Sequence, residues 1–416
     1  MTDICLAARA AARRLAALDR ATKDAALHAI ADALDARRGE ILEANERDLQ
    51  AGRESGLGAA LLDRLALNDA RIDEMAEGAR EIAALDDPVG EVIEEFDLPA
   101  GPHARKVRVP LGVVAIVYEA RPNVTIDAMA LSLKAGNATV LRGSSSAVHS
   151  NAILASIASE AAASAGVPEG SIALVAGGGR EELAELATQA GVVDLIVPRG
   201  GEGLKAALKD VATVPVIYAA SGNCHVYVDA TADLDAAEAI VVNAKTQRPG
   251  TCNAAETLLV HADVAAAFLP RALRALDAAG VELRVDERAR ALAGDGAPAL
   301  VDADESDWAT EFLALILAVK VVDSLDEAIE HVDRYGSGHS EAILTGDDDA
   351  ARAFQLGVDA ACVYVNASTR FTDGGQFGMG AEVGNSTQKL HARGPMGVRE
   401  LCTYKYLVEG AGHVRP

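Results

Sequence analysis

The stretch GVVAIVYEARPNVTIDAMALSLKAGNATVL, residues 112–141, decides the fold. Its first six residues are glycine or apolar, which predicts a buried strand over 112–117. A helical pattern follows over 126–135 and stops at Gly136-Asn137, and Ala138-Thr-Val-Leu141 then predicts a second buried strand. A short apolar strand, a helix and another apolar strand indicate a βαβ crossover in a parallel sheet.

The same alternation continues along the rest of the chain. In the first half, apolar runs predict strands over 172–175, 193–197 and 214–217, with helices over 147–165, 181–190 and 202–209. A second series predicts strands over 226–229, 257–260, 315–322, 341–344 and 362–365, with helices over 232–244, 264–278 and 325–332. We therefore predict an α/β protein with two doubly wound parallel-sheet domains.

The flanking regions have other patterns. Residues 3–84 have apolar positions at helical spacing and predict several helices, broken at Gly39 and over 52–58. Residues 90–110 predict a β hairpin. The hairpin and the apolar run 401–407 would leave open strand edges on a monomer, and such edges pair. We expect them to form an oligomerisation arm of a homo-oligomer, either a dimer or a tetramer.

The length of the chain predicts more than one domain. A chain of 416 residues is too long for one ordinary hydrophobic core. We expect N-terminal helices and a first α/β domain over 1–228, a second α/β domain over 229–372, and a C-terminal return and oligomerisation segment over 373–416.

Composition excludes several classes of protein. The net charge of −24 repels nucleic acid and anionic membranes, so we expect neither as a partner. The longest apolar run, 312–319, is far shorter than the roughly 20 residues that span a bilayer. Five cysteines, an odd number with no CxxC pair, predict reduced thiols in a cytoplasmic protein and no metal site.

One cysteine stands out from the other four. Cys252 lies in the polar segment 243–256, which is broken by Pro249 and Gly250, between a helical run and an apolar strand. Basic residues close by, Lys245 and Arg248, can favour a thiolate, and a thiolate in a loop can attack a carbonyl group. Cys252 is therefore the candidate nucleophile.

Four segments make a family resemblance specific. They are Asn243–Glu256, Tyr335–Ile343, Val363–Gly374 and Gly384–Met396, which carries Gly-Asn-Ser-Thr-Gln-Lys-Leu-His-Ala-Arg-Gly-Pro-Met. These segments closely resemble the γ-glutamyl phosphate reductases, also called glutamate-5-semialdehyde dehydrogenases, of the aldehyde dehydrogenase superfamily. The resemblance covers essentially the whole chain. It implies an aldehyde dehydrogenase-like fold with a nicotinamide-binding domain, a catalytic domain that carries the cysteine, and a β arm that joins subunits.

The resemblance also implies an activity. This is the NADPH-dependent reduction of L-glutamyl 5-phosphate to L-glutamate 5-semialdehyde, with release of phosphate, in the second step of proline biosynthesis. Cys252 would form a thioester, and the side chain of Asn123 with the backbone N–H of Cys252 would stabilise the oxyanion. From the residues alone, Asn123 is typical of a turn that follows a proline.

Cofactor residues are also implied only by the resemblance, because the chain has no GxGxxG fingerprint. Each implied phosphate contact lies where a strand ends and a helix begins, which favours phosphate. The implied residues are Arg142, Ser144, Ser145, Gly178, Arg199, Gly200, Gly201 and, for the nicotinamide ribose, Glu311. Ser145 stands where many members carry a lysine, so the exact contacts to the 2′-phosphate of NADP stay open.

Two other functions compete with this interpretation. A hydrolytic aldehyde dehydrogenase would need a base to activate water, but residues 211–228 contain no carboxylate, and His225 lies in a strand pattern typical of a structural residue. A non-catalytic nucleotide-binding protein would have no need for Cys252. The polar segments 335–340 and 366–370 are candidates for contacts to the amino acid end of the substrate or to its phosphate. A transient contact with glutamate 5-kinase, which would supply the unstable acyl phosphate, stays open.

Overall fold

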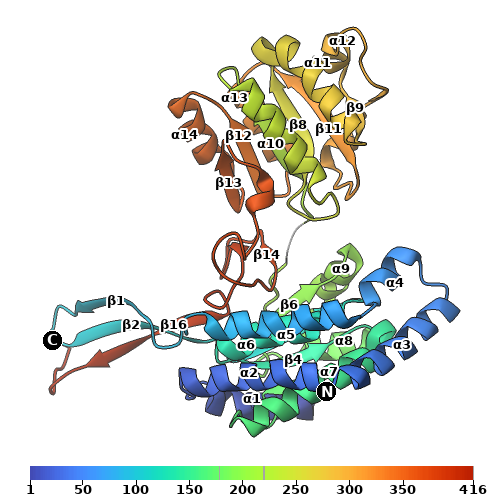
Figure 1. The fold of residues 1–416 in the computed structure, drawn as a ribbon. Coiled ribbons are helices and arrows are strands. Elements are labelled where there is room, and N and C mark those ends of the chain that lie inside the picture. Colours follow the sequence, from blue (N-terminus) through green and yellow to red (C-terminus); the bar gives the residue numbers. More distant parts are fainter. Residues whose placement is uncertain (178, 219–220, 416) are drawn as a thin grey trace. The chain divides into compact units, whose positions relative to one another are not determined.

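The computed structural model describes residues 1–177, 179–218 and 221–415, which form two compact units. Unit 1 comprises residues 1–218, 378–384 and 396–416, and unit 2 comprises residues 219–377 and 385–395. Each unit contains a parallel sheet with helices, as the alternating sequence pattern predicts (Figure 1). Unit 2 begins before the expected boundary at residue 228, because the strand Cys224–Val228 pairs with strands of the second sheet.

The sheet of unit 1 confirms the interpretation of residues 112–141. Its four parallel strands have the order β5-β4-β3-β6, with β3 (Val113–Tyr118) between β4 (Ala138–Arg142) and β6 (Leu195–Arg199), and β5 (Ile172–Leu174) at one edge. Helix α6 (Val124–Lys134) connects β3 to β4. All residues of β3 are buried, because helices cover both faces of a parallel sheet.

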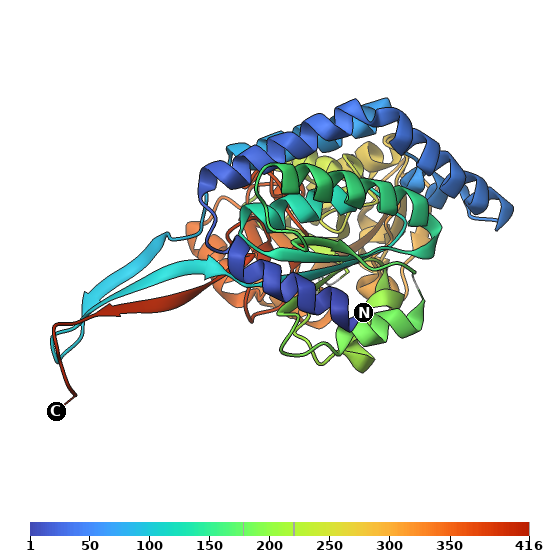
Figure 2. The ribbon, with the colours of Figure 1, turned by 90° about the horizontal axis from the view of Figure 1, so that it is seen from below.

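Helices make up most of the remainder of unit 1 (Figure 2). They are α1 (Thr2–Leu15), α2 (Arg20–Ala36), α3 (Arg38–Glu54), α4 (Ala59–Leu65), α5 (Asp69–Ala84), α7 (Val148–Ser164), α8 (Arg180–Ala187) and α9 (Glu202–Val211). The expected break at Gly39 is wrong, since this glycine lies in the first turn of α3 and the chain turns at Arg37. The fully buried Lys134 of α6 ties α2 and α5 together, with its Nζ 2.5 Å from the Asp24 carboxylate and 2.7 Å from the Ala83 carbonyl oxygen.

The predicted hairpin is present and gains a third strand. Strand β1 (Val92–Asp97) pairs antiparallel with β2 (His103–Pro110), and β16 (Cys402–Glu409) pairs with the other edge of β2. We call this three-stranded sheet the arm; Figures 1 and 2 show it projecting from the rest of unit 1. Six large apolar or aromatic side chains of the arm are exposed: Val92, Ile93, Phe96, Tyr404, Tyr406 and Val408.

The expected strand over 214–217 is wrong. Residue 216 forms only an isolated bridge with Ile196. Pro215 has no N–H group, so it cannot donate a hydrogen bond to a neighbouring strand. Its carbonyl oxygen does accept a hydrogen bond from the Ile196 N–H.

The sheet of unit 2 is larger. Its seven parallel strands have the order β10-β9-β11-β8-β7-β12-β13. They are β7 (Cys224–Val228), β8 (Ala255–His261), β9 (Glu282–Val285), β10 (Leu300–Asp302), β11 (Ile316–Val322), β12 (Ser340–Leu344) and β13 (Cys362–Val365). The helices are α10 (Leu234–Thr246), α11 (Ala262–Ala278), α12 (Glu287–Leu292), α13 (Leu325–Tyr335) and α14 (Asp348–Gly357). The sequence patterns missed β9, β10 and α12, which are short, and also α14, which has ten residues.

A search of the described residues for helices long and apolar enough to cross a bilayer returns no candidate. The five cysteines all lie within the described ranges, and none of them is in a disulfide. Two short 3₁₀ helices, Asp307–Ala309 and Thr369–Phe371, and the small β14–β15 hairpin (Asn385–Ser386 with Gly394–Pro395) complete unit 2.

Candidate functional site

The candidate nucleophile lies in a tight loop between α10 and β8. We call residues 247–254 the nucleophile loop. Cys252 is exposed, whereas the other four cysteines are buried. The Ala254 N–H donates to the Thr251 carbonyl oxygen at 3.0 Å, and the Thr251 hydroxyl donates to the Arg248 carbonyl oxygen at 2.8 Å. These bonds hold Cys252 in a turn that presents its thiol to solvent.

A second segment of unit 2 anchors this loop. The buried Asn253 donates from Nδ2 to the Thr372 carbonyl oxygen at 2.8 Å, and the Thr369 hydroxyl donates to the Asn253 carbonyl oxygen at 2.7 Å. The polar segment 366–370, which the sequence marks as a candidate for substrate contacts, therefore leads directly into residues that fix the loop.

The backbone of Gly222 packs directly against that of Cys252. A Cβ atom on Gly222 would lie 1.5 Å from the Cys252 carbonyl oxygen, so no other residue fits without movement of the loop. The Gly222 N–H donates to Glu311 Oε1 at 2.7 Å. Glu311, which the resemblance assigns to the nicotinamide ribose, thus holds the segment behind the nucleophile.

A buried ion pair joins the two ends of the nucleophile loop. Lys245, at the end of α10, lies 2.5 Å from Oε2 of Glu256, at the start of β8, and both side chains have 0% exposure. Burial raises the pKa of Glu256 to about 7 and lowers the pKa of Lys245. The sequence suggests that Lys245 favours the Cys252 thiolate, but its ammonium group is engaged with Glu256 and acts as a structural brace.

Two arginines supply positive charge near the thiol instead. Burial, followed by repulsion from Arg248, lowers the pKa of Arg370, and Arg370 lies close enough to Cys252 for their charges to interact. The Arg370 Nε donates to Gln247 Oε1 at 2.9 Å, which fixes the guanidinium against the loop. Cationic neighbours favour a thiolate, and they also attract an anionic substrate.

His225 lies beneath the site and not in it. Its ring is fully buried, and Nδ1 lies 3.0 Å from Oε2 of the equally buried Glu341. The neighbouring Cys224 donates from Sγ to the Cys252 carbonyl oxygen at 3.2 Å, and burial raises the pKa of its thiol well above the usual value. These groups support the loop from below, and the expectation of a structural role for His225 agrees with this burial.

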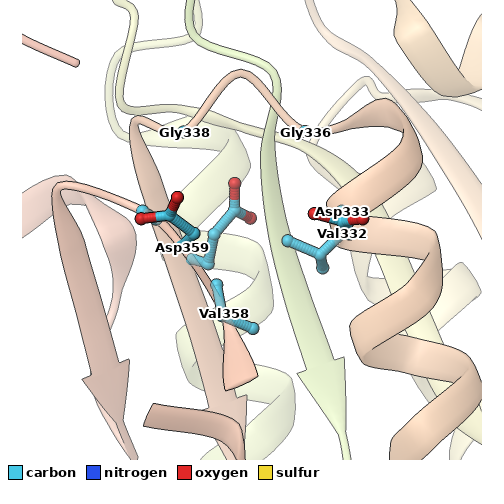
Figure 3. A pocket seen from close by; sticks show the side chains of 8 residues that line it. Val332, Asp333, Gly336, Gly338, Val358 and Asp359 are labelled. Atoms are coloured by element: carbon cyan, nitrogen blue, oxygen red, sulfur yellow. The ribbon is translucent and has the colours of Figure 1, made fainter. Parts of the chain in front are cut away.

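Unit 2 also contains a cavity of about 90 Å³, formed partly by the segment 335–340 (Figure 3). Its acidic lining residues are Asp333 from the last turn of α13, Glu341 from β12 and Asp359 before β13. The remaining lining residues, Val332, Gly336, Gly338, Val358 and Ala360, carry no basic side chain. This cavity is therefore acidic.

The candidate residues of unit 1 gather at the carboxyl ends of its strands. Strand β3 has β4 on one side and β6 on the other, and the chain runs β3, β4, β5 before it crosses to β6. Ligands of α/β proteins bind outside the carboxyl ends of strands at such a switch point. Asn123 follows β3 and Arg199 ends β6, so both lie at the switch point.

Asn123 precedes the first residue of α6. Its Nδ2 donates to Oδ2 of Asp127, one helical turn further on, at 2.8 Å. Both residues line a cavity of about 60 Å³ together with Arg121, Val124, Ala128, Arg199, Glu382 and Val383, all from unit 1. The sequence missed Asp127, although a carboxylate within the apolar helix 124–134 was a visible signal.

The other cofactor candidates lie at two neighbouring turns. Arg142, at the end of β4, is buried and donates from Nη2 to the Gly179 carbonyl oxygen at 2.6 Å. Ser144 accepts a bond from the Ala120 N–H at 3.2 Å, and Ser145 opens the 3₁₀ turn Ser145–Ala147 before α7. Gly178 lies outside the described residues.

The turn after β6 forms the N-terminus of α9. Gly201 is the residue that precedes this helix, and its N–H donates to Oε2 of Glu119 at 2.9 Å. A Cβ atom on Gly200 would lie 2.6 Å from the same carboxylate oxygen, so Glu119 packs closely against this turn. A carboxylate of the chain itself therefore occupies one donor that an anion could use.

The structure thus gathers Asn123, Arg142, Ser144, Ser145, Arg199, Gly200 and Gly201 at one sheet edge of unit 1. Cys252 and Glu311 belong to unit 2. Sequence reasoning missed Gly222, Glu256 and Glu341, since each acts through a contact with a buried partner or with a residue that is distant in sequence. It also missed Asp127, whose partner Asn123 is only one helical turn away.

Comparison with known proteins gives a consistent result. The model of the aldehyde dehydrogenase family matches residues 1–291 and 298–406. The gamma-glutamyl phosphate reductase of Moorella thermoacetica is 57% identical over 408 residues, which cover 98% of this chain and 97% of that protein. The corresponding protein of Thermobifida fusca is 55% identical with the same coverage.

Solved structures agree with the sequence comparison. The crystal structure of gamma-glutamyl phosphate reductase from Thermotoga maritima matches with a TM-score of 0.97 at 49% identity, covering 100% of this chain and 99% of that one. An acetylating aldehyde dehydrogenase from Geobacillus thermoglucosidasius matches with a TM-score of 0.69 at 20% identity, covering 100% of this chain and 97% of that one, and so shares the fold.

Replacement of Gly222 by alanine should displace the nucleophile loop, because the new methyl group would overlap the Cys252 carbonyl group. We expect a loss of about 3 kcal/mol in the free energy of unfolding and a slower alkylation of Cys252 by iodoacetamide. Gly250→Ala is the matched control, since only the Leu313 carbonyl oxygen, at 3.8 Å, lies within reach of its Cβ atom. Equal stability of the two variants would contradict the role of Gly222.

Replacement of Lys245 by methionine should leave the buried Glu256 charge without its partner. At pH 8 we expect the free energy of unfolding to fall by about 3–5 kcal/mol. The double variant Lys245→Met/Glu256→Met should recover most of this loss, because it removes both buried charges. Urea unfolding followed by the fluorescence of Trp308, the single tryptophan and a residue of unit 2, measures both effects.

The loss in Lys245→Met should also depend on pH. Burial raises the pKa of Glu256 above its value in the unfolded chain, so the folded state binds the proton more tightly. The loss of stability relative to wild type should therefore be smallest at low pH and should grow as the pH rises through 7 toward 8. If the difference in free energy of unfolding between Lys245→Met and wild type is the same at pH 5.5 and pH 8, Glu256 carries no uncompensated charge in the variant.

Proposed function

The chain belongs to the aldehyde dehydrogenase family and, within it, to the gamma-glutamyl phosphate reductases, so it is an oxidoreductase, and we propose that it reduces L-glutamyl 5-phosphate to L-glutamate 5-semialdehyde with NADPH. The reaction releases phosphate, proceeds through a thioester on Cys252, and forms the second step of proline biosynthesis. The single observation that carries the proposal is an exposed cysteine on a braced loop beside Arg248 and Arg370.

In the first step, the Cys252 thiolate attacks the acyl carbon of the acyl phosphate. The carbon–oxygen bond to the phosphoryl group breaks, phosphate leaves, and a thioester remains on Sγ. An unperturbed thiol is only a few per cent ionised at neutral pH, and cationic neighbours favour the thiolate form in general, which is the role proposed for Arg248 and Arg370. Arg248 and Arg370 also suit the dianionic leaving group, since guanidinium groups bind phosphate in a bidentate manner.

In the second step, the thioester carbon accepts a hydride and the carbon–sulfur bond breaks, which releases the aldehyde and the Cys252 thiolate. The backbone N–H of Cys252 and the side chain of Asn123 are the proposed donors to the oxyanion that forms in each step. Asn123 donates one Nδ2 hydrogen to Asp127, and the second hydrogen on the same nitrogen is the one proposed for the oxyanion.

Bound NADPH supplies the hydride. The residues of unit 1 fit a dinucleotide at one specific point: Arg142 Nε is buried and has no hydrogen-bond partner within the described ranges. A Cβ atom on the adjacent Gly143 would lie 2.0 Å from Asn151 Nδ2, so a side chain here would displace the buried amide of Asn151. We propose that Arg142, Ser144, Ser145 and Gly178 bind the cofactor with the turn 199–201, and that Glu311 contacts the nicotinamide ribose.

The surroundings of the loop favour reduction of the thioester over its hydrolysis. The segment 211–228 contains no carboxylate of its own, and two carboxylates contact it. Glu341 is fully buried beside His225, and Glu311 accepts a hydrogen bond from the Gly222 N–H and is the residue proposed for the nicotinamide ribose. Hydrolysis needs a base that can reach a water molecule beside the thioester. The absence of disulfides among the five cysteines supports a reducing compartment, so the cytoplasm is the proposed location.

Phosphate-dependent oxidation of glutamate semialdehyde tests the proposed function. With NADP, the wild type should form NADPH only when inorganic phosphate is present, and Cys252→Ala should lower the rate at least about 1,000-fold because the nucleophile is lost. Cys362→Ala, which removes a buried thiol in β13, serves as the control. A rate of NADPH formation that does not depend on phosphate would indicate that water hydrolyses the thioester. Turnover that persists in Cys252→Ala would exclude a thioester on Cys252.

We also propose that the arm joins subunits of a homo-oligomer. Tyr404, Tyr406 and Val408 alternate along β16, which puts their exposed side chains on one face, and β1 and β16 are open edges of the arm within the chain. Burial of such a face against a second subunit would remove apolar surface from water.

A charge on this face should weaken the assembly. For Tyr406→Glu/Val408→Glu we expect a lower molar mass than wild type by light scattering, because carboxylates would be buried without partners. Thr403→Glu is the control on the opposite face of the same strand. An unchanged mass in the double variant would exclude this face as the interface.

A further inference from the structure

The cavity beside Asn123 presents charges of both signs in a small volume. It measures about 60 Å³, and its five polar lining residues are Arg121, Asn123, Asp127, Arg199 and Glu382. Two of them are basic and two are acidic. An inorganic anion would meet two carboxylates here, and a simple cation would meet two guanidinium groups. A ligand group with adjacent positive and negative charges matches both signs.

Asp127 supplies a negative charge with little compensation. The only hydrogen bond to its carboxylate within the described part of the chain comes from Asn123 Nδ2. Its side chain keeps some exposed area but is closely surrounded by protein, and this burial raises its pKa to about 6. A carboxylate that is costly to bury gains most from a cation that binds beside it.

Arg199 supplies the positive charge on the same cavity. Among the residues that the structure describes, its guanidinium has no hydrogen-bond partner and no ion pair, although it lies near enough to Asp127 to lower that pKa. It packs against Gly384, where a Cβ atom would lie 2.7 Å from Nη1. A half-buried guanidinium with all of its N–H donors available is suited to a carboxylate, which it can bind through two parallel bonds.

We infer that this cavity binds the α-amino acid end of the substrate, with Asp127 on the α-ammonium group and Arg199 on the α-carboxylate. The inference rests on the proposed function, because Asn123 is taken as the donor to the reacting acyl oxygen. The backbone of the turn 199–201, where Glu119 already accepts the hydrogen bond from the Gly201 N–H, stays a proposed cofactor contact, while the side chain of Arg199 serves the substrate.

The length of the substrate agrees with this assignment. In an extended glutamyl chain the acyl carbon and the ammonium nitrogen are four bonds, or about 5 Å, apart. The two contact atoms, Asn123 Nδ2 and Asp127 Oδ2, lie 2.8 Å apart, and a hydrogen bond of about 2.9 Å to each of them lets two groups about 5 Å apart reach both. A substrate whose acyl oxygen meets Asn123 can therefore place its ammonium group at Asp127 without strain.

The acidic cavity of unit 2 is a poorer match for this group. Its lining contains Asp333, Glu341 and Asp359 and no basic side chain, so an α-carboxylate would meet only negative charge there (Figure 3). The cavity beside Asn123 is thus the better candidate for a zwitterionic group. It also gives the enzyme a means to reject aldehydes that lack either charge, since buried polar groups would be left unpaired.

Substrate analogues test the two contacts separately. In the phosphate-dependent oxidation, kcat/KM is measured for glutamate semialdehyde, for 5-oxopentanoate, which lacks the amino group, and for 4-aminobutanal, which lacks the carboxylate. The variants are Asp127→Asn and Arg199→Gln. In Asp127→Asn the oxygen of the new amide would still accept the bond from Asn123, so the variant removes the charge and keeps the position of the Asn123 side chain. Asp86→Asn and Arg47→Gln, at exposed sites of unit 1, are the matched controls.

We expect the preference of the enzyme for glutamate semialdehyde over 5-oxopentanoate to fall about 10- to 100-fold in Asp127→Asn, because a hydrogen bond to a charged group is lost. In Arg199→Gln the preference over 4-aminobutanal should fall by a similar factor. The KM for NADP should stay within about threefold of wild type, since neither contact involves the cofactor; urea unfolding confirms that the variants fold.

Other outcomes overturn the inference. A parallel loss of kcat/KM for all three aldehydes in Asp127→Asn would show that Asp127 only positions Asn123. A raised KM for NADP in Arg199→Gln, with unchanged preference among aldehydes, would return Arg199 to the cofactor. Failure of the proposed function can be told apart from failure of this inference. If the proposed function is wrong, wild type itself will show no phosphate-dependent turnover of glutamate semialdehyde.

Discussion

The buried ion pair between Lys245 and Glu256 is the constraint on which the nucleophile loop depends. The two residues end α10 and begin β8, so their contact closes the loop that carries Cys252. A closed loop has less conformational freedom to lose when the thiol is positioned for attack. The same pair cancels the charge of Lys245, which leaves Arg248 and Arg370 as the cations that we propose act on the thiol and on its substrate.

Close backbone packing adds to this constraint. Gly222 lies against the carbonyl group of Cys252, and Glu311 accepts a hydrogen bond from the Gly222 N–H. Asn253 is held from the other side by Thr369 and Thr372. Cys252 is therefore the exposed point of a closely packed loop, which fits its proposed role of meeting an unstable acyl phosphate in a fixed orientation.

Local charge, and not net charge, governs recognition in this protein. The chain carries a formal charge of −24, which disfavours every anionic ligand at long range. The substrate and cofactor that we propose are both anionic. Arginines at defined points, Arg142 and Arg199 in unit 1 and Arg248 and Arg370 in unit 2, overcome this field at short range, where the Coulomb interaction is strongest.

The sequence alone determined the fold class and the parallel strands, and it singled out Cys252 as the candidate nucleophile. Local patterns encode these features: apolar runs such as 112–117 predict buried strands, and a cysteine in a polar loop differs from one in a strand. Elements that it missed or misplaced, such as β9 and residues 214–217, are short or contain proline. A short segment shows too few repeats of the apolar pattern to identify a strand or a helix. Only the tertiary structure decided that Lys245 pairs with Glu256, that Gly222 must be glycine, and that Asp127 and Arg199 line one cavity. Each of these contacts joins residues whose meeting depends on strand order, strand register or helix packing, and no local pattern in a single sequence records that geometry.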